Sequence, residues 1–213
     1  MYLNMKLKMG VYWDEIPPHE KILGNWGELG RATLRLQFLT GEMESSIRKL
    51  KDLKTIYRLH HLVQSYYVGI FELRERLFLY VAALTKSKKV KDNLRNPNNR
   101  QGVYETLSCI SKDCVPHLKK IIKILEDDVD IRNIHTHDCF LRLVLHNNSH
   151  VFDIEDLWWE HEEEGVFMKR LVSLMRKEGL NMVKDYKIKV KLICAEIDLF
   201  IKALIPYIRE TGA

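Results

Sequence analysis

Apolar residues recur along most of this 213-residue chain at helical spacing, three and four positions apart. Over 53–85 they fall on nearly every side, which is typical of a helix at the centre of a bundle. The same spacing predicts further helices over 28–50, 103–126, 165–178 and 182–210. Only residues 2–13 alternate weakly, as a strand does. The pattern predicts an all-α fold, a bundle of five to seven helices.

The predicted helix over 28–50 carries a row of apolar side chains that we expect to face the core. Gly41 is a candidate bend in this helix, and Pro116 suits the first turn of a restarted helix within 103–126. The expected core row comprises Leu34, Leu36, Phe38, Met43, Ile47 and Leu50.

Composition fits a single domain. With 46% hydrophobic residues the chain can bury a sizeable core, and we expect an N-terminal arm over 1–27 followed by one all-α domain over 28–213. No apolar run resembles a signal peptide or reaches the roughly 20 residues of a membrane span, so we expect a cytoplasmic protein without a membrane partner. Its four cysteines form no C-x-x-C pair and are expected to be buried, reduced thiols.

Positive charge is concentrated in residues 86–102, which read KSKKVKDNLRNPNNRQG. The segment contains six Lys and Arg residues and one acid, so its net charge is +5. This value equals the formal charge of the whole chain. We expect a polar surface loop broken by Pro97. It is either simply solvated or an arm that contacts phosphates. The phosphate-binding candidates are Lys88, Lys89, Lys91, Arg95 and Arg100.

The densest candidate chemistry lies in residues 127–138, which read DDVDIRNIHTHD. Asp128 or Asp130 is expected to cap a helix that begins near Ile131, since acids suit the positive end of a helix. Arg132 and Asn133 would then lie in the first turn, where exposed backbone N–H groups beside a guanidinium can bind an anion.

This segment resembles a known family. Arg132-Asn133-x-x-x-His137 is similar to the R-x(4–6)-H motif of HEPN domains, in the variant with a polar residue after the Arg. The resemblance rests on the Asn and the helical setting, because the Arg-to-His spacing alone is common. It implies an all-α, often dimeric, metal-independent ribonuclease that needs no cofactor. The implied partners are RNA or a nucleotide, a second copy of the chain and an antitoxin-like protein.

The implied roles agree with the chemistry of the residues. RNA cleavage needs a base for the 2′-OH proton, an acid for the leaving 5′-oxygen and positive charge on the phosphorane. A His can serve as acid or base near neutrality, and an Arg can grip two phosphate oxygens. Asn133 would orient either group, and His135 is an alternative participant. Since one His does not obviously supply both acid and base, a dimer would complete the site.

Other interpretations remain open. Glu72 and Arg76, on the helix over 53–85, could support the motif from behind or simply face solvent. The same pocket could bind RNA or a nucleotide without cleaving it. Alternatively, Glu72-x-x-Glu75 with Asp127-x-x-Asp130 resembles the Mg²⁺ site of all-α nucleotide pyrophosphohydrolases. The histidines of this segment lack the spacing of a zinc site, so we expect no metal there.

Overall fold

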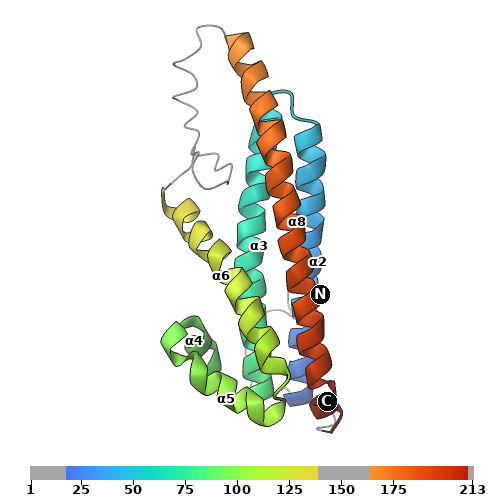
Figure 1. Ribbon diagram of the computed structural model, residues 1–213, viewed down its shortest axis with the longest axis vertical. Coiled ribbons are helices and arrows are strands. Elements are labelled where there is room, and N and C mark those ends of the chain that lie inside the picture. Colours follow the sequence, from blue (N-terminus) through green and yellow to red (C-terminus); the bar gives the residue numbers. More distant parts are fainter. Residues whose placement is uncertain (1–17, 139–163, 211–213) are drawn as a thin grey trace, which may run out of the picture.

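The computed structural model describes residues 18–138 and 164–210, and in these ranges it contains helices and turns without strands. Four long helices form the bundle: α2 (Pro18–Arg48), α3 (Leu53–Thr85), α6 (Cys114–Asp138) and α8 (Glu164–Glu210). Both α2 and α6 lie against α3 and against α8 (Figure 1). The short elements α4 (Val90–Arg95), η2 (Pro97–Asn99) and α5 (Arg100–Ile110) lead from α3 to α6. The predicted all-α bundle is confirmed.

Helix α3 has the predicted bounds because local chemistry marks both of its ends. Asp52 accepts a hydrogen bond from the Thr55 backbone N–H, while the Thr55 hydroxyl accepts one from the Asp52 N–H, which is a capping box. At the other end Lys86 adopts a left-handed conformation (φ 54°), and its N–H donates to the carbonyls of Ala82 and Ala83.

Helix α2 begins at Pro18, ten residues before the predicted start at 28, so residues 18–27 are helical. Leu36 is buried as predicted, together with Met43, Ile47 and Leu50. Leu34 and Phe38, however, are 63% and 66% exposed, so their assignment to the core row was wrong. They lie on a different side of the helix from Leu36, since two positions correspond to about 200° of rotation.

Helix α8 is continuous, whereas the sequence predicted two helices separated near residues 179–181. Gly179, which lies between the two predicted helices, packs against Ile47 of α2. A Cβ atom at Gly179 would lie 3.1 Å from Cδ1 of Ile47, so the missing side chain permits close approach of the two helices. By contrast, the predicted restart at Pro116 is confirmed, since α5 ends at Ile110 and α6 begins at Cys114.

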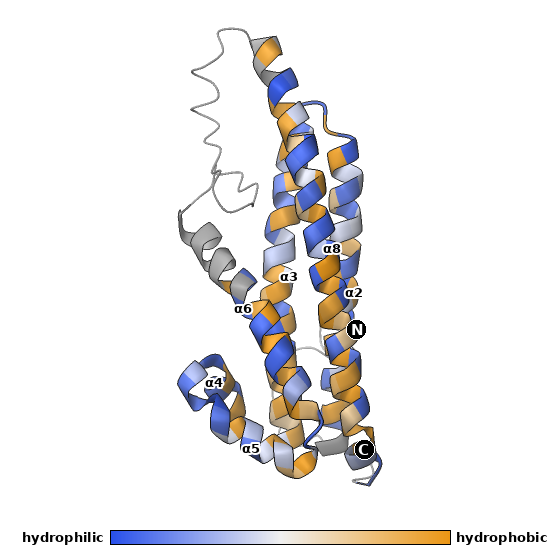
Figure 2. Cartoon of the chain, viewed as in Figure 1, coloured by the Kyte–Doolittle hydropathy of each residue, from blue (hydrophilic) through white to orange (hydrophobic). Residues whose placement is uncertain are grey.

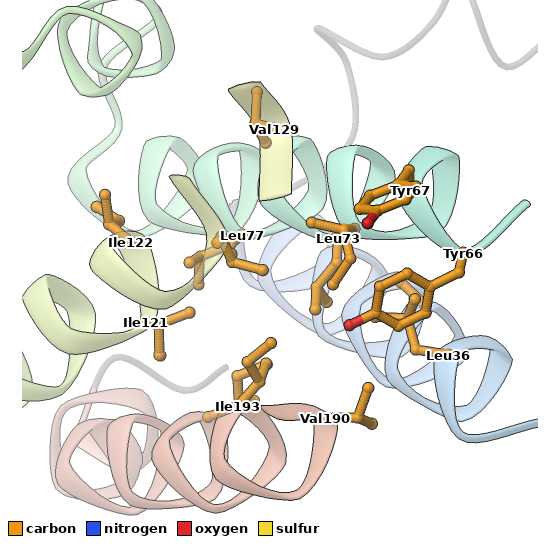
Figure 3. Packing of buried hydrophobic residues seen from close by; sticks show 14 of the residues in the cluster. Leu36, Tyr66, Tyr67, Leu73, Leu77, Ile121, Ile122, Val129, Val190 and Ile193 are labelled. Atoms are coloured by element: carbon orange, nitrogen blue, oxygen red, sulfur yellow. The ribbon is translucent and has the colours of Figure 1, made fainter. Parts of the chain in front are cut away.

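Apolar side chains from all four long helices meet along the bundle axis, where the hydrophobic faces turn toward one another (Figure 2). Figure 3 shows Leu36 of α2, Leu73 and Leu77 of α3, Ile121 of α6 and Ile193 of α8 converging. Of the cysteines predicted to be buried, Cys114 is buried and Cys194 is half-buried. Cys109 is exposed at the surface of α5, contrary to that prediction, and Cys139 lies outside the described residues.

One buried acid ties α8 to α6. Glu196 of α8 is 6% exposed, and its carboxylate accepts hydrogen bonds from Lys120 Nζ at 2.5 Å and from His117 Nδ1 at 2.8 Å. The hydrogen bond from Lys120, followed by that from His117, lowers the pKa of Glu196 below its ordinary value. The folded state therefore favours the charged carboxylate.

We expect Glu196→Gln to lower the urea midpoint of unfolding at pH 7 and to have little effect at pH 3. Because the folded pKa lies below the ordinary value of 4.5, the wild-type carboxylate stabilises the fold above about pH 4.5. That contribution disappears as the pH falls through the folded pKa. Urea titrations of both proteins from pH 3 to 7 measure the difference between their unfolding midpoints. A difference that stays constant with pH contradicts a stabilising role for the charged Glu196 carboxylate.

Candidate functional site at the end of helix α6

Residues 127–138 form the last part of α6, which runs unbroken from Cys114 to Asp138. The predicted helix start near Ile131 is therefore wrong. Asp128 and Asp130 lie within the helix and not at its start. The backbone N–H groups of Arg132 and Asn133 lie inside the helix, where they bond to carbonyls one turn earlier. The anion site expected from free N–H groups at a helix start is consequently absent from α6 at these residues.

The motif residues continue this helix, but the side chains of residues 131–138, including His135, lie outside the described part of the chain. Their backbone still fixes one relation. Positions 132 and 137 are five residues apart, which corresponds to about 140° around the axis of an α-helix. A single copy of α6 therefore does not place Arg132 and His137 on one narrow stripe.

A buried ion pair anchors α6 one turn before Arg132. Asp128 is 2% exposed, and it accepts a hydrogen bond from Lys189 Nζ of α8 at 2.6 Å. The next residue, Val129, is 4% exposed and joins the apolar core (Figure 3). Helix α6 is thus held in the bundle up to Val129, three residues before Arg132.

Three tyrosines surround this anchor. The hydroxyls of Tyr67 on α3 and Tyr186 on α8 lie 2.6 Å apart. The rings of Tyr66 and Tyr186 stack with centroids 4.2 Å apart and planes within 7°. Burial, with a further contribution from the Asp128 charge, raises the pKa of Tyr66 well above its ordinary value and that of Tyr67 to about 12. The tyrosines are therefore neutral hydroxyl donors beside a buried carboxylate, a cluster that sequence reasoning missed.

The predicted phosphate-binding loop over 86–102 is folded rather than extended, since it contains α4, η2 and the start of α5. Lys91 and Arg95 both pair with Glu75 of α3; the Lys91 Nζ–Oε2 distance is 3.1 Å. Arg100 pairs with Glu126 of α6, and its Nε donates to the Leu94 carbonyl at 2.7 Å. These three cations hold α4 and α5 against the bundle.

The carboxylate of Glu75 is the centre of that contact. Its side chain is only 14% exposed. Burial alone would raise its pKa, but hydrogen bonds from Arg95 and Lys91 outweigh burial and lower the pKa. Of the five predicted phosphate ligands, Lys88 and Lys89 are the exposed lysines, located at the turn before α4.

The other acids and bases of α3 that were expected near the motif face α2. Glu72 Oε2 lies 2.7 Å from Arg35 Nη1, and Arg76 lies 3.9 Å from Glu28. Glu72 and Glu75 thus pair with different partners. Among the side chains that the structure describes, which do not include those of Asp127 and Asp130, no three His, Cys, Asp or Glu residues form a metal-binding group.

Searches of protein-family models, of curated proteins and of solved structures found no match for this chain. Within the described residues, no helix is both long enough and apolar enough to cross a membrane.

Proposed function

We propose that this protein is a HEPN-like, metal-independent ribonuclease that acts through Arg132, Asn133 and His137 near the end of α6. The observation that supports it best is the anchor before the motif. Asp128 and Lys189 fix α6 in an all-α bundle one turn ahead of Arg132. A buried, hydrogen-bonded anchor limits the movement of the helix that carries reacting groups, and such positioning is a large part of catalysis.

The proposed reaction is a phosphoryl transfer within the RNA. A histidine takes the 2′-OH proton, the 2′-oxygen attacks phosphorus, and the bond from phosphorus to the 5′-oxygen breaks. The 5′-oxygen receives a proton from an acid, and the products carry a 2′,3′-cyclic phosphate and a 5′-OH. Arg132 neutralises charge on the phosphorane while Asn133 orients the phosphate or the imidazole. Because positions 132 and 137 diverge on one helix, we propose that a second copy of the chain completes the site.

The same divergence favours a second candidate function. If no second copy joins the site, Arg132 and Asn133 would bind an RNA phosphate while His137 stays remote from it. The protein would then be an RNA- or nucleotide-binding module without turnover. The two functions differ in a single measurable property, the appearance of cleaved product.

Cleavage of a single-stranded RNA in EDTA tests the proposal. We expect product with a 2′,3′-cyclic phosphate from the wild type, and a loss of about 100-fold or more in Arg132→Ala and in His137→Ala, since one acid–base group contributes about 10²–10⁴. The rate per chain should also fall on dilution, because a shared site needs two copies.

Matched controls are Arg209→Ala and His61→Ala, which remove the same side chains at exposed positions of α8 and α3. They should cleave at the wild-type rate, and circular dichroism should show that all four variants are folded. RNA binding without product supports the binding module. Cleavage that persists in both motif variants, or that requires Mg²⁺, contradicts the ribonuclease.

A further inference from the structure

A second concentration of positive charge lies at one end of the bundle. Segments 48–58 and 169–177 together contain nine Lys and Arg residues and one acid. Their combined net charge of +8 exceeds the +5 of the whole chain. They are distant in sequence but meet in space, where α2 ends, α3 begins and the first half of α8 passes beside them (Figure 1). Each segment is basic on its own, but only the fold joins the two into one surface.

The charge surrounds a cavity. A cavity of about 510 Å³, which we call the basic pocket, is lined by the cations Lys51, Lys169, Arg176 and Lys177. The apolar side chain of Leu50 contributes to its wall. A guanidinium N–H of Arg176 donates to the Leu50 carbonyl, which holds that side chain at the edge of the pocket.

Local acids do not neutralise these cations. Asp52, the acid within the two segments, caps α3 through the Thr55 N–H at 2.9 Å, and this hydrogen bond is the main reason that its pKa is lowered. In the described part of the chain, no acid forms an ion pair with Lys51, Lys169 or Lys177. Two other cations of these segments, Arg48 and Arg58, do pair with Glu44 and Glu42, just as three cations of 86–102 pair with Glu75 or Glu126.

The surroundings of the pocket favour a chain of phosphates over a single anion. A neighbouring cavity of about 410 Å³ shares Lys51 and adds Lys49 and Arg58. Arg58 pairs with Glu42 of α2 at 3.4 Å, so Lys49 is the residue that extends the positive charge toward the turn from α2 to α3. Tyr57, just before Arg58, is 56% exposed. Basic grooves with exposed aromatic rings bind single-stranded nucleic acid through phosphates and stacked bases.

The pocket shares helix α8 with the ion pair that precedes the motif. Arg176 precedes Lys189 by thirteen residues on α8, about 20 Å along a helix. Lys189 pairs with Asp128, one turn before Arg132. Thirteen residues also correspond to about 220° around the helix, so an RNA that contacts both the basic pocket and the motif segment has to pass around α8.

We propose that the basic pocket binds backbone phosphates of single-stranded RNA. In this proposal the basic pocket holds the RNA substrate of the proposed ribonuclease. Its use in cleavage rests on that function, whereas binding can be measured separately. The contact is electrostatic, so it should be insensitive to base sequence and strongly weakened by salt.

Fluorescence anisotropy with a labelled RNA of about twelve nucleotides, 2′-O-methylated to prevent cleavage, measures the binding. The triple variant Lys51→Ala, Lys169→Ala, Lys177→Ala should bind at least about tenfold more weakly. Its plot of log K against log salt should be less steep by about 2, since each single-strand phosphate contact contributes about 0.7. All three lysines are exposed, so the fold should survive, which thermal unfolding verifies.

The matched control is Lys112→Ala, Lys123→Ala, Lys202→Ala, which removes the same charge from exposed positions elsewhere. Its affinity should stay within about threefold of wild type. If the two triple variants lose RNA affinity equally, the proposal is overturned. It is also overturned if the variant of Lys51, Lys169 and Lys177 binds RNA as tightly as the wild type. The proposal is overturned as well if the wild-type protein binds phosphatidylserine vesicles but does not bind RNA.

These outcomes separate the two proposals. If the first triple variant loses RNA binding while the wild type cleaves nothing, the basic pocket is supported and the ribonuclease is contradicted. If Arg132 and His137 are needed for cleavage while the triple variant binds normally, the ribonuclease stands and the pocket is rejected.

Discussion

Lys189→Met is expected to lower the free energy of unfolding at pH 7 by about 3–5 kcal/mol, because it leaves a buried carboxylate without its lysine. Asp128 is 2% exposed in side-chain area, whereas Lys189 is 28% exposed. Asp128→Asn should therefore cost less, about 1–2 kcal/mol, since the unpaired ammonium can turn toward water. Urea unfolding followed by circular dichroism measures both losses.

The loss in Lys189→Met should depend on pH with a definite sign. Without the lysine the folded variant holds a buried carboxylate that has lost its cation, and protonation in acid removes that charge. The deficit should be largest at neutral pH and shrink as the pH falls toward 4. The double variant Asp128→Asn with Lys189→Met should regain part of the stability, since it removes both charges. A loss below about 1 kcal/mol at pH 7, or one independent of pH, would show that the pair is not buried in solution.

The Asp128–Lys189 pair also explains why the helix start predicted near Ile131 was wrong. Consecutive acids before Ile131 have the composition of a cap, and local preference alone supports that interpretation. The partner that keeps Asp128 inside a helix lies 61 residues further along the chain. No local pattern around residue 128 contains that information, so the continuous α6 could not be predicted from it.

Other differences share this cause. The bounds of α3 were predictable because apolar periodicity and the Asp52 capping box coincide there. Gly179 lies between the two helices predicted over 165–178 and 182–210, yet in the fold it permits close packing against Ile47 of α2. The loop over 86–102 seemed free for phosphates, but Glu75 and Glu126 pair with its cations. Local signals predicted the elements, while contacts between distant segments decided the surfaces.

The motif and the basic pocket illustrate the two kinds of signal. Arg132, Asn133 and His137 lie within six residues, so their pattern is visible in the sequence. The basic pocket joins Lys51 to Lys169, 118 positions apart, and only the return of α8 past the end of α2 brings them together. A site built from a local motif can be proposed without a fold, whereas a docking surface of this kind cannot.

Phe200→Ala and Phe38→Ala delete the same ring from opposite environments, and we expect very different results. Phe200 is fully buried and meets Tyr80 edge to face, with ring centroids 6.2 Å apart, so its loss should cost about 3–5 kcal/mol. Phe38 is 66% exposed, and its replacement should change the free energy of unfolding by less than about 0.5 kcal/mol. Urea unfolding of the two variants and the wild type at one protein concentration measures the contrast.

The contrast also tests the correction made to α2, because the sequence assigned Phe38 to the core. A loss at Phe38 as large as that at Phe200 would mean that this face of α2 is covered in solution. Repeating the measurement at lower protein concentration identifies the cover, since a loss that depends on concentration requires a second chain, whereas contact within the chain does not. Because Phe38 is exposed, Phe38→Ala should have the wild-type urea midpoint at every protein concentration. Only Phe200→Ala should unfold at a lower urea concentration.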